Sequence, residues 1–274
     1  MEKSDNTFYL EDGNSSVPVA LPDGLTGAQL LGFKAFSDWH RCLKNSLEKQ
    51  KLGDHPFRQT PYRLRRIQVD SFDKPRDRIL FVKMVATITN DHGDALPGVV
   101  FLRGGSVAVL LILRPLDALD ERYVVMTEQP RPAAGSLRFM EIPAGMLDDE
   151  ENFAGAAARE IREEVGLQLN KGDLVDMTAL ALRGQQTEEN MRDAMYPSPG
   201  ACDEFISIFL WEREKERMEI EDLKDKLAGE RAEQENITVR LMDYERLLAV
   251  GARDAKTLAA WSLYEYLKRT RLLD

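Results

Sequence analysis

The sequence predicts an α/β fold for this chain of 274 residues. Two apolar segments, Val107–Leu113 and Phe205–Trp211, are rich in the β-branched and aromatic residues that favour strands. Between them, the stretch from Phe153 to Val165 repeats its apolar residues at helical spacing. A last helix is predicted over about residues 255–269. Strands on both sides of a central helix, followed by a terminal helix, are typical of layered α/β domains.

The chain is organised around the central helix. Asp148 and Asp149 precede it as polar capping residues, and Gly166 follows it as a C-terminal glycine would. Its apolar face must be buried, and the residues on that face are Phe153, Ala154, Ala157, Ala158, Ile161 and Val165.

Three glutamates lie on the arc of this helix beside the apolar face. Glu160 is three residues from Glu163 and four from Glu164, so we expect their carboxylates to converge. Carboxylates this close repel one another unless a cation lies among them. Oxygen ligands suit Mg²⁺, Mn²⁺ or Ca²⁺ better than zinc. The alternative is a solvated acidic helix face, which is the usual meaning of a Glu-rich helix.

The spacing of the whole stretch from Gly145 to Leu167 favours the metal site. It runs glycine, five residues, glutamate, seven residues, Arg-Glu, an aliphatic residue, one residue, Glu-Glu, one residue, glycine and an aliphatic residue. This pattern resembles the Nudix box, found in hydrolases that split a nucleoside diphosphate linked to another moiety. The resemblance implies an α/β/α sandwich with a mixed sheet. It also implies that the box helix holds a divalent metal, Mg²⁺ or Mn²⁺, against the diphosphate.

The same resemblance assigns roles to residues of the box. Glu160 and Glu164 are expected to be direct metal ligands, together with the backbone carbonyl of Ala144. Glu163 is expected to be a direct or water-mediated ligand and is a catalytic candidate. Arg159 is expected to pair with box carboxylates and hold the loop–helix geometry.

Two flanking stretches narrow the resemblance. EQPRPAAGSLRFMEIPAGMLD and YPSPGACDEFISIFL resemble the ADP-ribose and ADP-sugar pyrophosphatase branch. The longer form MRDAMYPSPGACDEFISIFLWE is most similar to plant-type ADP-sugar diphosphatases. The resemblance implies that Arg131 lies near substrate phosphate and that Glu141 and Glu204 contact substrate. Gly200-Ala201 departs from the glycine pair of bacterial members.

A general base is expected from a late acidic loop that ends AEQENITVRL. In bacterial members of the branch, this loop carries a glutamate base and a second metal-binding glutamate. Counting back from Ile237 places Glu233 at the base position and Glu235 at the metal position. The alternative is coincidence, because the surrounding run is rich in glutamate.

Residues 1–95 are predicted to form a separate N-terminal α+β portion. A short strand is predicted at Thr7–Leu10, a helix over about residues 26–50, and a strand at Ile79–Asn90. Thr26 followed by Gln29 predicts a capping box at the start of this helix. Residues 51–78 are predicted to be an irregular basic connector. This portion looks too small to form a robust core alone, and related pyrophosphatases exchange N-terminal strands, so we expect a homodimer.

Residues 96–274 are predicted to form the hydrolase domain. Its further strands are expected at Tyr123–Gln129, Leu137–Pro143, Leu174–Arg183 and Ile237–Met242. The charged run 212–235 has only a weak apolar stripe and is expected to begin as a solvated helix or loop. Asp254 predicts the N-cap of the last helix. The expected core-side residues of that helix are Leu258, Trp261, Ser262 and Tyr264.

Composition limits the environment and the partners of the chain. Its net charge of −10 argues against binding to a nucleic-acid backbone, which needs a basic footprint. Two cysteines far apart in sequence form no disulfide framework and favour a reduced compartment. No apolar run reaches the length of a membrane span, and the N-terminus resembles neither a signal nor a transit peptide. We therefore expect a cytoplasmic location without membrane partners.

Three functions remain open on the sequence. The first is Mg²⁺-dependent hydrolysis of an ADP-sugar, ADP-ribose or ADP-glucose, to AMP and a sugar phosphate. The second is hydrolysis of another dinucleotide, such as a dinucleoside polyphosphate or NADH. The third is a non-catalytic domain that senses ADP-ribose or binds a protein, although no box carboxylate is missing. Which sugar is preferred depends on pocket shape.

Overall fold

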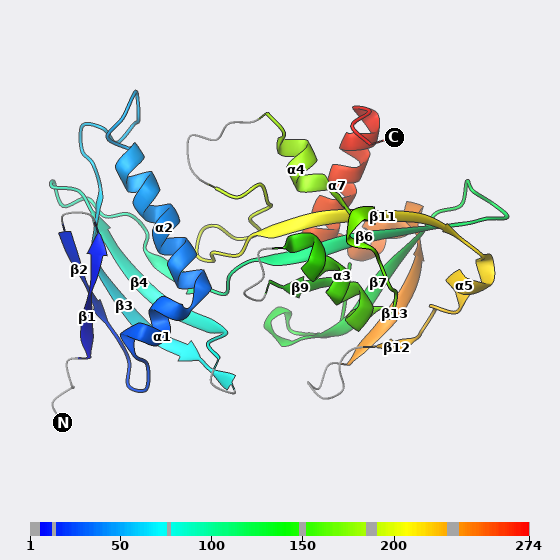
Figure 1. Ribbon diagram of the computed structural model, residues 1–274, viewed down its shortest axis with the longest axis horizontal. Coiled ribbons are helices and arrows are strands. Elements are labelled where there is room, and N and C mark those ends of the chain that lie inside the picture. The colour runs from blue at the N-terminus through cyan, green and yellow to red at the C-terminus, as the bar shows by residue number, and fades with distance from the viewer. Residues whose placement is uncertain are drawn as a thin grey trace. The chain divides into compact units, whose positions relative to one another are not determined.

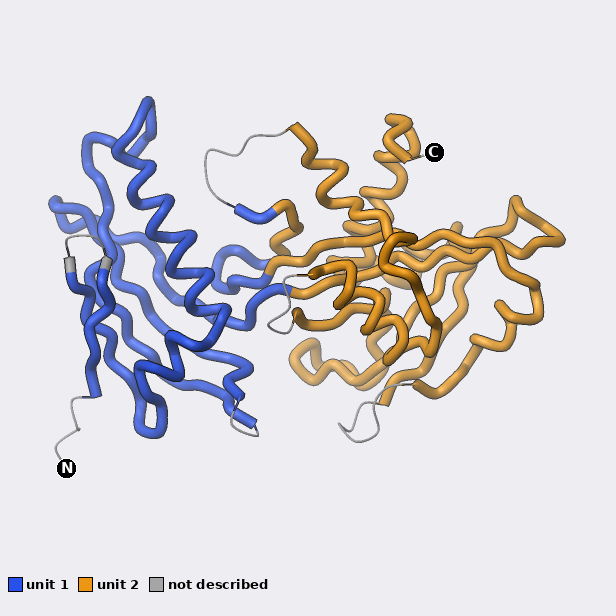
Figure 2. The backbone as a smooth tube through the Cα atoms, in the orientation of Figure 1, with its two compact units in different colours: residues 1–105, 185–192, 198–204 blue, residues 106–184, 193–197, 205–274 orange. Residues whose placement is uncertain are grey.

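The computed structural model describes residues 6–12, 15–75, 78–147, 152–184, 191–228 and 236–273. They divide into two compact units (Figure 2). The first unit comprises the described residues of 1–105, 185–192 and 198–204, and the second those of 106–184, 193–197 and 205–274. The first unit thus also takes in a segment that follows the central helix in sequence, whereas the sequence analysis placed one boundary near residue 95.

The first unit is a sheet with two helices (Figure 1). Its described strands have the order β1-β2-β3-β4-β5, and only β2 and β3 run parallel. The strands are β1 (Thr7–Asp12), β2 (Ser15–Ala20), β3 (Arg63–Asp73), β4 (Phe81–Thr89) and β5 (Val99–Leu102). The helices are α1 (Gly27–Gly32) and α2 (Lys34–Lys49).

The helix predicted over residues 26–50 is two helices. Thr26 caps α1, and the predicted capping box with Gln29 is present. Phe33 interrupts the helix because its backbone is extended, at φ −77° and ψ 109°. Both helices then send apolar residues, among them Leu30 and Phe36, into one buried core with the sheet.

The predicted connector over residues 51–78 is wrong, because β3 occupies part of it. Leu64, Ile67 and Val69 are buried, while charged residues between them face solvent. Register shifts between Leu64 and Arg66, and between Val69 and Ser71, break the alternation that would have marked a strand. The unit therefore has a core of its own, so the argument from a small core for dimerisation is wrong.

The second unit is built on a mixed sheet. Its described strands have the path β10-β11-β6-β7-β13-β12, with β8 paired to β7 and β9 to β6. β11 and β6 are parallel and the other pairs are antiparallel. The strands are β6 (Ser106–Pro115), β7 (Tyr123–Arg131), β8 (Ser136–Glu141), β9 (Ala144–Met146), β10 (Val175–Asp176), β11 (Ile206–Lys215), β12 (Leu227–Ala228) and β13 (Ile237–Asp243).

Helices cover both faces of this sheet (Figure 1). They are α3 (Phe153–Glu164), α4 (Met177–Leu182), α5 (Arg217–Glu221), α6 (Leu247–Gly251) and α7 (Ala255–Arg269). Alternate residues of β6 pack on α3 and α5 on one side, and on α4, α6 and α7 on the other. All residues of β6 from Ser106 to Leu113 are buried, which explains its continuous apolar sequence. This is the predicted α/β/α sandwich with a mixed sheet.

Three predictions for this unit need correction. Leu174–Arg183 is mainly the helix α4, because the Asp176 side chain caps it by accepting from the Ala179 amide at 2.9 Å. The run 212–235 continues β11 to Lys215 and then forms α5, which places Ile220 in the core. In α7 the buried residues are Thr257, Ala260, Tyr264 and Leu267, while Leu258 is exposed.

Candidate functional site

The box helix α3 is held by its caps and its apolar face. Asn152 caps it, accepting from the Gly155 amide at 3.0 Å, whereas the predicted caps Asp148 and Asp149 lie outside the described residues. Gly166 ends it in the left-handed region at φ +78°, which glycine adopts without strain. Ala157 and Ile161 pack on the sheet. The glutamates of the last turns are thereby fixed beside β9.

Glu164 is buried against the start of the box. Its Oε2 accepts a hydrogen bond from the Ala144 amide at 3.0 Å, and its Oε1 accepts one from Gln129 Nε2 at 3.3 Å. Burial raises the pKa of Glu164 to about 8, helped by the nearby charges of Glu160 and Glu141. A cation bound beside this buried carboxylate would stabilise its charged form.

Glu160 occupies the space that a side chain at Gly145 would fill. A Cβ built on Gly145 would lie 1.9 Å from the Glu160 carboxyl carbon. The glycine therefore allows the Glu160 carboxylate to reach the backbone of β9, which also contains Ala144. Two carboxylates and a nearby backbone carbonyl are hard oxygen donors that fit Mg²⁺ or Mn²⁺.

Glu163 does not join them in a three-carboxylate cluster. Its carboxylate is directed to arginines, with Arg162 at 3.6 Å and Arg159 at 3.9 Å. Arg159 also pairs with Glu160 at 3.3 Å, as expected for a residue that holds the box geometry. Across the described ranges, no three Asp, Glu, His or Cys side chains are grouped closely enough to hold a metal. The predicted convergence fails because Glu163 and Glu164 are consecutive and point about 100° apart around the helix, one towards arginines and the other into the fold.

Arg131 and Glu141 are brought together from neighbouring strands. Arg131 Nε donates to Glu141 Oε1 at 2.7 Å across the β7–β8 pair. Glu141 has only 3% of its side chain exposed, whereas Arg131 has 42%. Among described residues, Arg131 makes no hydrogen bond through its two terminal nitrogens. This leaves the fork of the guanidinium open to a ligand such as phosphate.

Two residues that hydrogen-bond to the carboxylates of Glu141 and Glu164 were not predicted from the sequence. Lys256 Nζ donates to the second oxygen of Glu141 and lies 3.0 Å from Asp254 Oδ1. Gln129 donates to Glu164, and no role was predicted for Gln129. A lysine in the first turn of a helix is an unusual placement that could have drawn attention to Lys256.

Three further site residues were predicted from the sequence. Glu204 belongs to the first unit, where its carboxylate pairs with Arg103 at 3.0 Å. Glu233 and Glu235 lie outside the described residues.

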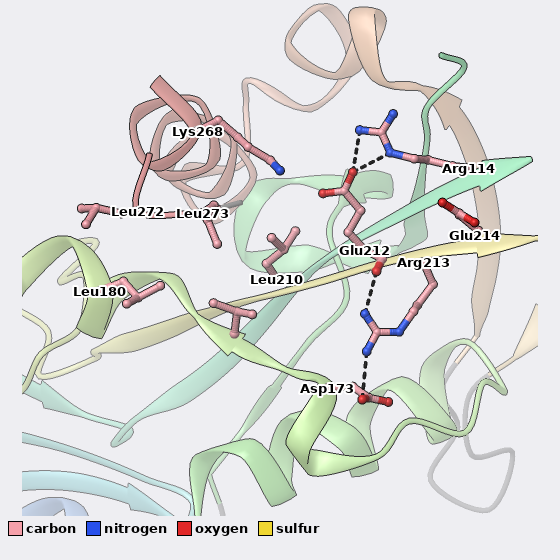
Figure 3. A pocket seen from close by; sticks show the side chains of 11 residues that line it. Arg114, Asp173, Leu180, Leu210, Glu212, Arg213, Glu214, Lys268, Leu272 and Leu273 are labelled. Atoms are coloured by element: carbon pink, nitrogen blue, oxygen red, sulfur yellow. Dashed lines mark hydrogen bonds and ion pairs between the residues drawn. The ribbon is translucent and has the colours of Figure 1, made fainter. Parts of the chain in front are cut away.

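A hollow of about 810 Å³ lies on the face of the sheet opposite the box helix, between β11 and α7 (Figure 3). Its arginines are already paired: Arg114 with Glu212 at 2.6 Å and Arg213 with Asp173 at 2.9 Å. Its helices are α4 and α7, whereas the box helix covers the opposite face. We therefore place the candidate active site at the box and not in this hollow.

Comparison with known proteins shows the family of this chain. The family model described as "NUDIX domain" matches residues 103–262, more than half of the chain. The chain belongs to the Nudix family. It is 40% identical over 266 residues to "Nudix hydrolase 14, chloroplastic" of Arabidopsis thaliana, which covers 95% of this chain and 80% of that protein. The protein is thus a Nudix hydrolase, acting on the pyrophosphate of a nucleotide-derived substrate.

Two shorter matches cover less of the chain. The chain is 31% identical over 121 residues to "ADP-ribose pyrophosphatase" of Bacillus subtilis, which is 44% of this chain and 52% of that protein. It is 33% identical over 105 residues to an uncharacterised Nudix hydrolase of Schizosaccharomyces pombe, which is 38% of this chain and 41% of that protein. Of the helices described, none is long and apolar enough to cross a membrane.

Replacing Gly145 by alanine is expected to weaken metal binding without unfolding the Nudix domain. The new Cβ displaces the Glu160 carboxylate, which is the flexible end of a long side chain, so the backbone does not have to move. Displaced ligand geometry typically costs roughly 10- to 100-fold in metal affinity or activity. The Mg²⁺ concentration for half-maximal activity measures the effect. Gly172→Ala is the matched control, because a Cβ there meets no atom within 4 Å. Equal Mg²⁺ requirements in the two variants would contradict the placement of Glu160.

The metal-free Nudix hydrolase is expected to lose stability as pH rises. The pKa of Glu164 lies above its ordinary value of 4.5, at about 8, because burial disfavours the charged form. The stability contributed by this group is therefore complete below pH 4.5 and is lost as pH rises towards 8. Thermal melts in EDTA should fall across this window in the parent but not in Glu164→Gln. Added Mg²⁺ should reverse the fall, because it binds the ionised carboxylate. Parallel pH profiles for the two proteins would contradict this expectation.

Proposed function

We propose that this Nudix hydrolase splits the diphosphate of an ADP-sugar, ADP-ribose or ADP-glucose, into AMP and a sugar phosphate. The observation that carries the proposal is the Arg131–Glu141 pair. Its guanidinium fork is open within the described residues, and Glu141 is close enough to Glu164 to affect its pKa. An arginine beside a carboxylate site suits a substrate with two linked phosphates. The partial match to a protein named ADP-ribose pyrophosphatase supports the same substrate class.

Different residues bind the phosphoryl group and the metal ion. Arg131 binds a phosphoryl group, and Glu141 orients the guanidinium. Glu160 and Glu164, with the Ala144 carbonyl, hold Mg²⁺ or Mn²⁺. When bound, that cation neutralises charge on the phosphoryl oxygens and polarises water. Glu163 is a further candidate for a water-mediated contact, and its ion pairs with Arg159 and Arg162 hold its carboxylate near the helix.

The base and the remaining substrate contacts are proposed from the sequence. Glu233 takes a proton from the attacking water, and Glu235 adds a metal ligand when substrate is bound. The attacking oxygen bonds to one phosphorus while the bridging oxygen leaves with the other phosphate. Glu204 contacts substrate from the segment that follows the box.

A substrate panel tests the proposal. Purified protein with Mg²⁺ should release AMP from ADP-ribose or ADP-glucose faster than from NADH or diadenosine polyphosphates, and EDTA should stop the release. Preferred cleavage of NADH or a diadenosine polyphosphate would replace the proposed substrate class. Binding of ADP-ribose by calorimetry without hydrolysis of any substrate would favour a sensing domain.

We also propose a homodimer formed through the first unit. Among the described residues, β1 is an edge strand of the sheet and exposes Tyr9, and an edge strand can pair with a second chain. Light scattering at micromolar concentration should give twice the 31.1 kDa mass of the chain. Tyr9→Lys should shift the protein towards monomer, whereas exposed Leu52→Lys is the control. A monomer in the parent protein would refute the proposal.

A cytoplasmic location remains part of the proposal, along with the absence of nucleic-acid partners. The Arabidopsis thaliana relative is named as chloroplastic, so the two compartments are the outcomes to separate. A fluorescent fusion at the C-terminus should give diffuse cytoplasmic signal. Signal confined to plastids would overturn the expected location.

A further inference from the structure

Lys256 occupies a position where a positive charge is electrostatically unfavourable. It is the second residue of α7, after the N-cap Asp254, where the positive end of the helix dipole repels a cation. Only 12% of its side chain is exposed, so its ammonium group has also lost most of its contact with water. Both features cost free energy unless the charge is closely paired. Its partners are two carboxylates, those of Glu141 and Asp254.

Glu141 is shared between Lys256 and Arg131. Its Oε2 accepts from Lys256 Nζ, and its Oε1 accepts from Arg131 Nε at 2.7 Å. With both oxygens held, the carboxylate has one orientation, and that orientation determines where the Arg131 guanidinium points. Without Lys256, one oxygen of a nearly buried carboxylate lacks its cation, and the group can rotate.

The backbone beside Glu141 is held by the same turn of α7. Thr257 Oγ1 accepts from the Ile142 amide at 3.1 Å and donates to Asp254 Oδ2 at 2.6 Å. Thr257 packs closely against the backbone of Gly251, since a Cβ built on Gly251 would lie 2.6 Å from Thr257 Cγ2. The turn therefore has little room to shift. The first turn of α7 therefore fixes the side chain of Glu141 and the amide that follows it.

We propose that Lys256 is a positioning residue for the substrate diphosphate. It holds Glu141 so that the terminal nitrogens of Arg131 face the phosphoryl group. The inference rests on the proposed function in that Arg131 is taken to bind phosphate. It adds that the C-terminal helix, distant in sequence from the box, sets the affinity of this site.

Kinetics of Lys256→Met test the proposal, since methionine keeps the unbranched side chain, one atom shorter, and removes its charge. Loss of a supporting contact typically costs roughly 10- to 100-fold, here expected in KM with kcat changed much less. Lys256→Arg should restore most of the affinity, because a guanidinium can still reach Glu141. Lys268→Met is the matched control, since it removes a lysine from the other end of α7. Melting temperatures of all variants identify any that fail to fold.

A double-mutant cycle separates positioning from general support of the fold. In an Arg131→Ala background, Lys256→Met should have little further effect on KM, because the group that it positions is gone. Equal losses in both backgrounds, or a KM within about twofold of the parent in Lys256→Met, would overturn the inference. If Lys256→Met does not fold, Lys256→Gln takes its place, because it removes the charge and keeps a polar side chain.

The same measurements distinguish this inference from the proposed function. They use whichever diphosphate the parent protein hydrolyses best, so failure of ADP-sugars in the panel leaves the cycle intact. If no substrate is hydrolysed, the dissociation constant for ADP-ribose replaces KM. Hydrolysis of ADP-ribose that is insensitive to Lys256 would reject the inference and leave the proposed function standing.

Discussion

Glu164→Gln is expected to remove most hydrolytic activity while the Nudix domain stays folded. The carboxylate is buried, and its amide replacement has the same shape. The new amide oxygen can still accept from the Ala144 amide, and the new NH₂ group can donate to Gln129 Oε1 once the side-chain amide of Gln129 flips. What it loses is the negative charge that the metal needs. Metal assistance supplies several kcal/mol to such a reaction, so we expect a loss of roughly 10²- to 10⁴-fold in kcat.

AMP release at saturating Mg²⁺ is the measurement, with the melting temperature taken beside it. Glu219→Gln is the control, because that carboxylate is mostly exposed on α5 and pairs only loosely with Lys215 at 3.6 Å. Near-normal turnover in Glu164→Gln at saturating Mg²⁺ would refute the assignment of this residue as a ligand. A loss of both activity and fold would instead make Glu164 a structural residue.

Glu233→Gln is expected to lower kcat by roughly 10²- to 10⁴-fold with little change in KM, as removal of a general base does. The expectation follows from the chemistry of the box. A carboxylate bound to metal has its proton affinity lowered, so the base has to come from elsewhere. Glu233 lies in the late acidic loop, which is polar, contains Gly229 and precedes β13. Single-turnover rates across pH measure the effect, because loss of a base also removes the acidic limb of the profile.

Glu235→Gln is expected to weaken metal binding without affecting the general base. It should raise the Mg²⁺ requirement while kcat at saturating Mg²⁺ stays close to that of the parent. Glu230→Gln is a control from the same run of sequence. If Glu233→Gln and Glu235→Gln both hydrolyse ADP-sugars like the parent, the loop is a linker. The base must then be sought at Glu163 or Glu204.

Features set by neighbouring residues could be predicted well from the sequence. The bounds of α7, the N-cap at Asp254 and the capping box at Thr26 depend on contacts within one turn of helix. β6 was predictable because a strand buried on both faces is apolar throughout. β3 was not, because two register shifts break its alternation and its polar face resembles a loop.

The candidate site was likewise predictable only where it depends on residues close together in sequence. The residue types of the box, and the pairing of Arg159 with its carboxylates, followed from spacing along one helix. The direction of each carboxylate did not. Glu163 lies among arginines and Glu164 is buried, because packing of α3 on the sheet rotates one towards solvent and the other inwards.

The sequence by itself determined the family, the α/β class and the oxygen-rich chemistry of the box, since these depend on residues close together in the chain. Only the tertiary structure brought Lys256 to Glu141, across 115 positions of sequence. No local pattern encodes that contact, because it arises where the first turn of α7 packs against the end of β8. The raised pKa of Glu164 has the same origin, since burial is a property of the packed fold and not of the helix.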